Sequence, residues 1–143
     1  MTFRRLALAA ILLALPGVAF AQSDTQTPPG LSLELNAAHD VDGACRLIFL
    51  VQNNADTAID AASYESVIFD ASGTFVRLTL FEFRDLPAGR PRVRRFDVRD
   101  TSCDNLGRVL INGLSSCTAG GAESTVCDPT PTLRSRTEVE LLG

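Results

Sequence analysis

The sequence predicts an all-β domain, a sandwich of seven antiparallel strands with two disulfides, behind an N-terminal export signal. Short apolar runs follow one another along the chain, separated mostly by Gly, Pro, Asn and Asp turns. Outside the first 21 residues, no stretch has the 3.6-residue hydrophobic period of a helix. Four cysteines follow that segment, and an even number is typical of a disulfide framework.

Residues 1–21 have the pattern of a secretory signal peptide. Arg4 and Arg5 precede an apolar run at 6–15, and small residues, including Ala21, flank the expected cleavage site. The run is too short to span a bilayer, which requires about 20 apolar residues. We expect cleavage after Ala21, and therefore a periplasmic or secreted protein without a stable membrane anchor. The arginine pair is compatible with twin-arginine export, but the Sec route is favoured.

The mature chain divides into a flexible spacer at 22–30, ending in Pro-Pro-Gly, and one domain at 31–143. The first strand alternates strictly, the second is apolar on both faces like a central strand, and the fourth alternates in two registers. The turn sequence that ends at Gly73 predicts a β-hairpin between the third and fourth strands. The seven expected strands are 31–35, 45–53, 64–69, 74–83, 93–98, 108–112 and 137–142. A partly closed barrel is the alternative architecture.

The expected core consists of apolar residues from one face of each strand. Its members are Leu33, Leu35, Leu47, Phe49, Val51, Val67, Phe69, Val76, Leu78, Phe96, Val98, Val109 and Ile111. Between the last two strands, residues 113–134 are polar and rich in Gly, Ser, Thr and Pro. A structureless loop of that length is uncommon in a compact domain and is often functional. A plain surface excursion is the simpler reading and is slightly favoured.

The four cysteines allow three disulfide pairings. We favour Cys45–Cys103 and Cys117–Cys127, because the second pair closes a short loop and the first joins a strand start to a distant turn. On the chain-entropy model the long bridge stabilises by roughly 4 kcal/mol and the short one by under about 3 kcal/mol. Zinc is the rival reading, but the chain has no Cys-x-x-Cys spacing and His39 is its single histidine.

Charge and aromatic content argue against nucleic-acid binding. All 13 basic residues are arginine, and loss of Arg4 and Arg5 changes the formal net charge from −4 to −6. An acidic domain lacks the basic surface that non-specific nucleic-acid binding needs. The chain has no tryptophan, and Tyr64 is its single tyrosine, so stacking platforms for bases or sugars are scarce.

Five arginines form the densest charged feature of the chain. Arginine forks suit carboxylate, sulfate or phosphate groups, so one hypothesis is a face that binds an anionic partner. Strand alternation would place Arg92 and Arg94 on one face and Arg95 and Arg99 on the other. The favoured alternative is that charges protect an edge strand from aggregation while nearby aspartates neutralise them. The candidate anion-binding residues are Arg90, Arg92, Arg94, Arg95 and Arg99.

Catalytic and metal-binding patterns are weak. His39 lies in an acidic turn with Asp40 and Asp42, which we interpret as a turn stabilised by local hydrogen bonds rather than a metal site. No Gly-x-Ser-x-Gly or His-Glu-x-x-His motif occurs, and bridged cysteines leave no thiolate nucleophile. We therefore expect no catalytic residue, no metal and no cofactor. A carboxylate-dependent periplasmic hydrolase stays as an alternative, although Glu34, Glu65 and Glu82 are expected at outward positions on strands.

The middle of the chain carries a family resemblance. Asn53 follows an apolar strand, Phe69-Asp70 precedes Ala71-Ser72-Gly73, and Leu86-Pro87-Ala88-Gly89 leads into a further strand. This progression, over residues 46–98, resembles the FxLYD-type immunoglobulin-like domains of bacterial exported proteins, with Phe-Asp in place of Tyr-Asp. The whole chain is also similar to small exported proteins known mainly by a Tat-pathway signal sequence. The resemblance implies an immunoglobulin-like fold and export, and transfers no functional residues.

These observations lead to a functional expectation. We expect an exported binding or accessory module that contacts a protein or envelope component, with no enzymatic activity. The hypothesised contact surface is the loop around Cys117–Cys127, because loops at one end of a sandwich commonly carry recognition.

Overall fold

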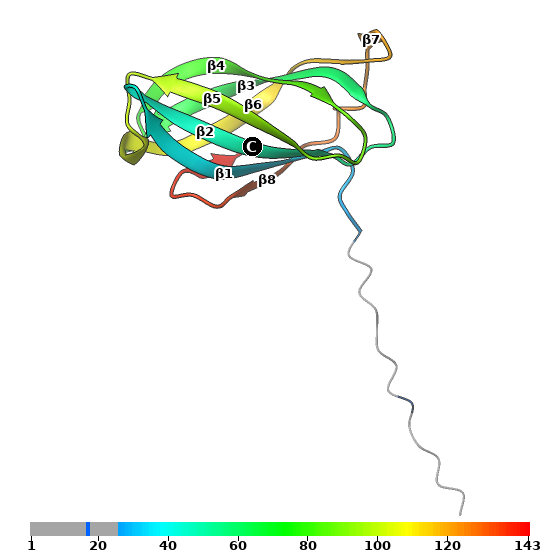
Figure 1. The fold of residues 1–143 in the computed structure, drawn as a ribbon, viewed down its shortest axis with the longest axis horizontal. Coiled ribbons are helices and arrows are strands. Elements are labelled where there is room, and N and C mark those ends of the chain that lie inside the picture. Colours follow the sequence, from blue (N-terminus) through cyan, green and yellow to red (C-terminus); the bar gives the residue numbers. More distant parts are fainter. Residues whose placement is uncertain (1–16, 18–25) are drawn as a thin grey trace, which may run out of the picture.

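The structure is a computed structural model that describes residue 17 and residues 26–143. The expected cleavage site and nearly all of the expected signal peptide lie outside the described residues. Two twisted β-sheets pack face to face and enclose the core (Figure 1). In the described part of the chain, no helix is long and apolar enough to cross a membrane.

Nine strands and one short 3₁₀ turn form the described domain. In chain order they are β1 (Leu31–Val41), β2 (Ala44–Asn53), β3 (Ile59–Asp70), β4 (Phe75–Leu86), β5 (Arg92–Arg99), η1 (Cys103–Asn105), β6 (Leu106–Ala119), β7 (Ala122–Glu123), β8 (Thr132–Ser135) and β9 (Glu140–Leu142). The all-β expectation is confirmed. The strands number nine rather than seven because the C-terminal part of the chain contributes three short ones.

The sheets are mixed, whereas the sequence predicted only antiparallel pairing. Sheet A has the order β5-β2-β1-β8, and sheet B has the order β4-β3-β6-β7, with β9 also paired to β6. The long neighbours pair antiparallel, but β8 runs parallel to β1 and β9 runs parallel to β6. The chain changes sheets between β8 and β9, where the Ser135 hydroxyl donates to the Val139 carbonyl at 2.6 Å. The expected single strand at 137–142 is therefore confined to its last three residues.

The expected long loop is mostly ordered by the sheets. β6 extends well beyond its predicted end at Asn112 and reaches Ala119, where it forms a tight hairpin with β7. The chain then returns to sheet A through β8. Between β6 and β8, the Gly120-Gly121 turn and the stretch from 124 to 131 lack strand structure. The prediction of a loop over 113–134 is therefore wrong for more than half of its length, because β6 keeps its pairing with β3 through Gly113 and Ser116.

The core lies between the sheets, and the residues that β4 contributes to it differ from those predicted. Leu78 is 52% exposed and Val76 is also exposed, whereas Phe81 and Phe83 are buried. On the inner face of sheet A, Phe49 contacts Phe83 edge-to-face at 5.8 Å between ring centroids. Phe69 and Phe96 are only partly buried. Val67 is buried but lies outside the core cluster that contains Tyr64 and Ile68, and the remaining predicted core residues are buried within it. The apolar residues of β4 continue along both faces, and only packing against sheet A decides which face is inside.

Candidate functional site

The two disulfides pair Cys45 with Cys103 and Cys117 with Cys127, the connectivity that loop geometry favoured. The first joins the start of β2 to η1 at one end of the sandwich. The second closes the hairpin formed by the end of β6 and β7. Two disulfides fit a protein of an oxidising, extracytoplasmic compartment.

The tethered hairpin, residues 117–127, protrudes from the body of the sandwich (Figure 1). Its turn is Gly120-Gly121, where both residues have positive φ angles of 62° and 79°, which glycine adopts without steric cost. The Gly121 amide donates to an Asp60 carboxylate oxygen at 2.9 Å, and the Ser124 amide donates to the Cys117 carbonyl at 3.0 Å. These bonds and the disulfide hold the hairpin in one position while residues 120–123 stay exposed.

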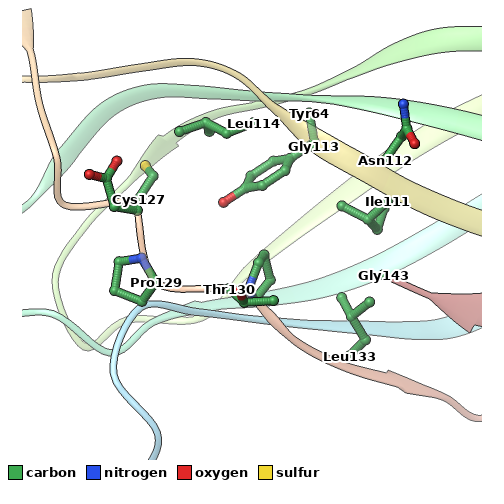
Figure 2. Close-up of a pocket in the computed structure, with 12 residues that line it drawn as sticks. Tyr64, Ile111, Asn112, Gly113, Leu114, Cys127, Pro129, Thr130, Leu133 and Gly143 are labelled. Atoms are coloured by element: carbon green, nitrogen blue, oxygen red, sulfur yellow. The ribbon is translucent and has the colours of Figure 1, made fainter.

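A cavity of about 240 Å³ lies beside the base of the tethered hairpin (Figure 2). One wall is formed by β6 at residues 111–114, and the opposite wall is the chain that follows the disulfide at 127–131. Leu133 of β8 and Gly143 close the side toward sheet A, and Tyr64 of β3 forms the floor. The cavity therefore lies between the two sheets on the side opposite the β4–β5 connection.

Tyr64 carries a buried polar atom that is left without a hydrogen-bond partner in the described part of the chain. The residue is 2% exposed, and the unsatisfied atom is its phenolic oxygen, Oη. The ring contacts Phe83 edge-to-face at 6.0 Å, and Figure 2 shows the hydroxyl directed toward the chain at Cys127 and Pro129. Burial raises the pKa of Tyr64 from its ordinary value of 10.0 to about 12. The phenol is therefore a neutral hydrogen-bond donor at physiological pH.

The five candidate anion-binding arginines do not form one site. β5 is an edge strand of sheet A, and its alternation places Arg92 and Arg94 toward the interior and Arg95 and Arg99 outward. Arg90 lies exposed before the strand. The Arg92 guanidinium donates to the neighbouring Pro91 carbonyl at 3.1 Å. The arginines of β5 are therefore divided between two faces of an edge strand, the position at which charged residues hinder sheet-to-sheet aggregation.

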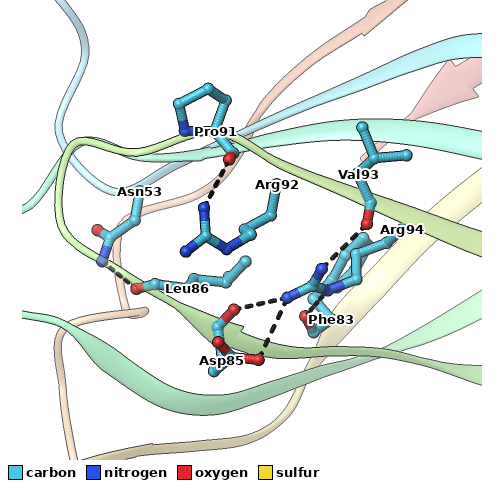
Figure 3. Close-up of polar contacts among 8 residues, drawn as sticks. All are labelled: Asn53, Phe83, Asp85, Leu86, Pro91, Arg92, Val93 and Arg94. Carbon is cyan, nitrogen blue, oxygen red and sulfur yellow. Dashed lines mark hydrogen bonds and ion pairs between the residues drawn. The ribbon is translucent and has the colours of Figure 1, made fainter.

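The Arg94 side chain is hydrogen-bonded to the protein's own backbone (Figure 3). It is 7% exposed and donates to the Phe83 carbonyl, to the Asp85 carbonyl at 2.7 Å and to its own neighbour Val93 at 3.0 Å. Desolvation by burial lowers its pKa, and Arg84 lowers it further. Because two of these bonds join β5 to backbone carbonyls of β4, Arg94 links the edges of sheets A and B rather than offering a site to an anion.

The acids and the histidine are dispersed. Glu34 lies in sheet A, where Arg136 donates to it at 2.9 Å, and Glu65 and Glu82 lie in sheet B. None of the three lines the cavity beside Tyr64. Near the end of β1, Asp40 accepts a bond from the Cys103 amide at 2.7 Å, which is a long-range contact with η1 rather than the local turn bond that the sequence suggested. Over residues 26–143, no three His, Cys, Asp or Glu side chains are grouped to hold a metal ion.

Sequence reasoning missed the cavity. The sequence analysis used Tyr64 only as a sign that stacking platforms are scarce. It predicted that Val67 and Phe69 are the residues of this strand that face the core. The side chains that face inward on β3 are instead Tyr64, Ser66 and Ile68. The sequence does contain a clue to the cavity, because a tyrosine in the core has a hydroxyl that requires a hydrogen-bond partner. This clue is usable only if Tyr64 is first assigned to the buried face of β3.

Together, the fold and this site define a class of protein: a small two-sheet β-sandwich with two disulfides, a tethered hairpin and a cavity at its base. The solved structure of IrmA from Escherichia coli is similar, with a TM-score of 0.53, 10% sequence identity, and coverage of 76% of this chain and 92% of that chain. At this identity the likeness shows the fold alone. No protein-family model matches the chain, and no curated protein matches it.

Proposed function

We propose that this chain is an exported, non-catalytic binding or accessory module with an immunoglobulin-like fold. It works in the periplasm or outside the cell, and it contacts a protein or envelope component through the tethered hairpin. The signal-like residues 1–21 and the two disulfides support export. The similarity to IrmA supports the sandwich fold.

The observation that carries the proposal is a protruding hairpin held rigid by three separate restraints. The Cys117–Cys127 disulfide, the Asp60 carboxylate and the Ser124 amide fix its backbone, although residues 120–123 bury little surface. A preorganised loop loses little conformational entropy when it binds, which favours recognition. Binding residues are commonly placed on loops positioned by a rigid scaffold.

Site-specific crosslinking tests the proposal. A photoreactive residue at Ala122, at the hairpin, is compared with one at Glu138, in the exposed β8–β9 connection. We expect one discrete partner crosslinked in the periplasm from position 122 and absent from position 138. In the chain with the photoreactive residue at 122, Glu123→Arg should abolish that product, and Glu138→Arg should leave it unchanged. Equal crosslinking from both positions, or a product that survives Glu123→Arg, would reject the hairpin as the contact surface.

A further inference from the structure

The cavity beside Tyr64 has the chemistry of a ligand site separate from the hairpin. Its walls are mainly hydrocarbon, from Ile111, Leu114, Pro129, Pro131 and Leu133. The polar residues Asn112, Asp128 and Thr130 also line it and are exposed, so they belong to its rim. An apolar interior with a few directed polar groups is the usual composition of a small-molecule site.

The buried hydroxyl of Tyr64 is the independent observation that indicates a ligand. A polar group without a partner in the interior is unfavourable, and a phenylalanine would fill the same volume without that penalty. Within residues 26–143, Tyr64 Oη has no hydrogen-bond partner, although its ring is packed by Phe83 and by the walls of the cavity. The Tyr64 hydroxyl is directed toward the segment that closes the cavity (Figure 2).

We propose that this cavity binds a small, uncharged, largely apolar molecule whose carbonyl, amide or ether oxygen accepts a hydrogen bond from Tyr64 Oη. Oη exposes less than 1 Å² of surface, so the ligand oxygen reaches it by displacing the chain at 128–131. That segment is anchored at its ends by the Cys127 disulfide and by β8. Between these ends it has few hydrogen bonds, because Pro129 and Pro131 have no amide to donate and the Asp128 amide bonds to the nearby Thr125 carbonyl at 3.0 Å.

The charges around the cavity narrow the ligand class. The lining includes Asp128 and no basic residue, so a carboxylate or phosphate would meet repulsion without a counter-charge. The neutral phenol of Tyr64 keeps its O–H hydrogen at physiological pH, and an acceptor oxygen on the ligand would satisfy that donor. The volume of about 240 Å³ is below the roughly 300–1,000 Å³ typical of sites for drug-sized ligands, which selects a small molecule.

A matched pair of probes tests the hydrogen bond. Cyclohexanone and methylenecyclohexane have nearly the same shape, but only the ketone has an acceptor oxygen. Binding to the oxidised chain is followed by NMR through the backbone amides of Leu114 and Thr130, which lie on opposite walls. We expect the ketone to bind about 3- to 10-fold more tightly than the hydrocarbon, the value of one neutral hydrogen bond.

Two variants distinguish the proposed contact from a structural effect. Tyr64→Phe should fold normally and abolish the preference for the ketone. Ser66→Ala removes another buried hydroxyl on the same face of β3, and it should retain the preference. The proposal is overturned if neither probe shifts these amides up to its solubility limit, if both bind wild type equally, or if the preference survives in Tyr64→Phe. None of these outcomes depends on the hairpin or its partner.

Discussion

Arg94 is a charged residue that the fold uses as a backbone clamp. Its guanidinium reaches from β5 across the open side of the sandwich and donates to the Phe83 and Asp85 carbonyls of β4 (Figure 3). These carbonyls lie on an edge strand and have no partner strand on that side. A planar guanidinium can satisfy several acceptors at fixed spacing, which the single ammonium of lysine cannot do.

Replacement of Arg94 by methionine should therefore lower the free energy of unfolding by about 2–3 kcal/mol, because it leaves carbonyls of β4 unpaired in a partly buried position. The matched control is Arg95→Met on the adjacent, outward position, which should change stability by less than about 0.5 kcal/mol. Urea unfolding monitored by circular dichroism measures both. Equal losses for the two variants would contradict the clamp.

For individual residues of β5, strand alternation predicted correctly that Arg92 and Arg94 lie on one face and Arg95 and Arg99 on the other. It could not predict that one of the two inward arginines would be buried among carbonyls. That outcome depends on the distance between the edges of two sheets, and no local pattern encodes this distance. For the same reason, the sequence pattern could not predict that the Tyr64 hydroxyl is buried without a hydrogen-bond partner among the described residues.

The element that departs furthest from its prediction is β4. Apolar residues at alternate positions on both of its faces make either face a reasonable core face from sequence. The structure buries Phe81 and Phe83 against Phe49 of sheet A and leaves Leu78 and Leu80 on the outer surface. Aromatic rings bury more surface than leucine and fill the space between the sheets.

The assignment of faces on β4 is testable by truncating one residue from each face. Phe83→Ala should lower the free energy of unfolding by about 3–5 kcal/mol, because it opens a cavity in the aromatic core. Leu78→Ala should cost below about 1 kcal/mol, because its side chain is already half in water. Chemical denaturation of both variants gives the comparison, and a larger loss for Leu78→Ala would reverse the assignment.

For the molecule as a whole, titration in alkali is unusually simple. The chain has no lysine and one tyrosine, and all four cysteines are bridged. Tyr64 is therefore the side chain that releases a proton between the ranges of histidine and arginine. Its pKa rises from 10.0 in the unfolded chain to about 12 in the fold, because burial penalises the phenolate.

This shift predicts a loss of stability at high pH. Below pH 10.0 both states hold the phenolic proton, and stability does not depend on it. Between pH 10.0 and about 12 the unfolded chain releases the proton while the fold retains it, so stability falls by about 1.4 kcal/mol per pH unit. Urea unfolding across this range measures the slope. Tyr64→Phe should remove the fall, and an identical fall in that variant would assign it to another group.

Sequence alone establishes the all-β class, most of the turn positions and the alternation within β1 and β5, and it favours the cysteine pairing found in the structure over the two other pairings. Those features follow from local chemistry: side-chain period, glycine and proline in turns, and short covalent loops. The buried face of β3 and β4, the parallel placement of β8 and β9 and the cavity beside Tyr64 become apparent only from tertiary packing. Each of these depends on how two distant sheets approach one another, and that approach minimises exposed apolar area over the whole chain rather than within any segment.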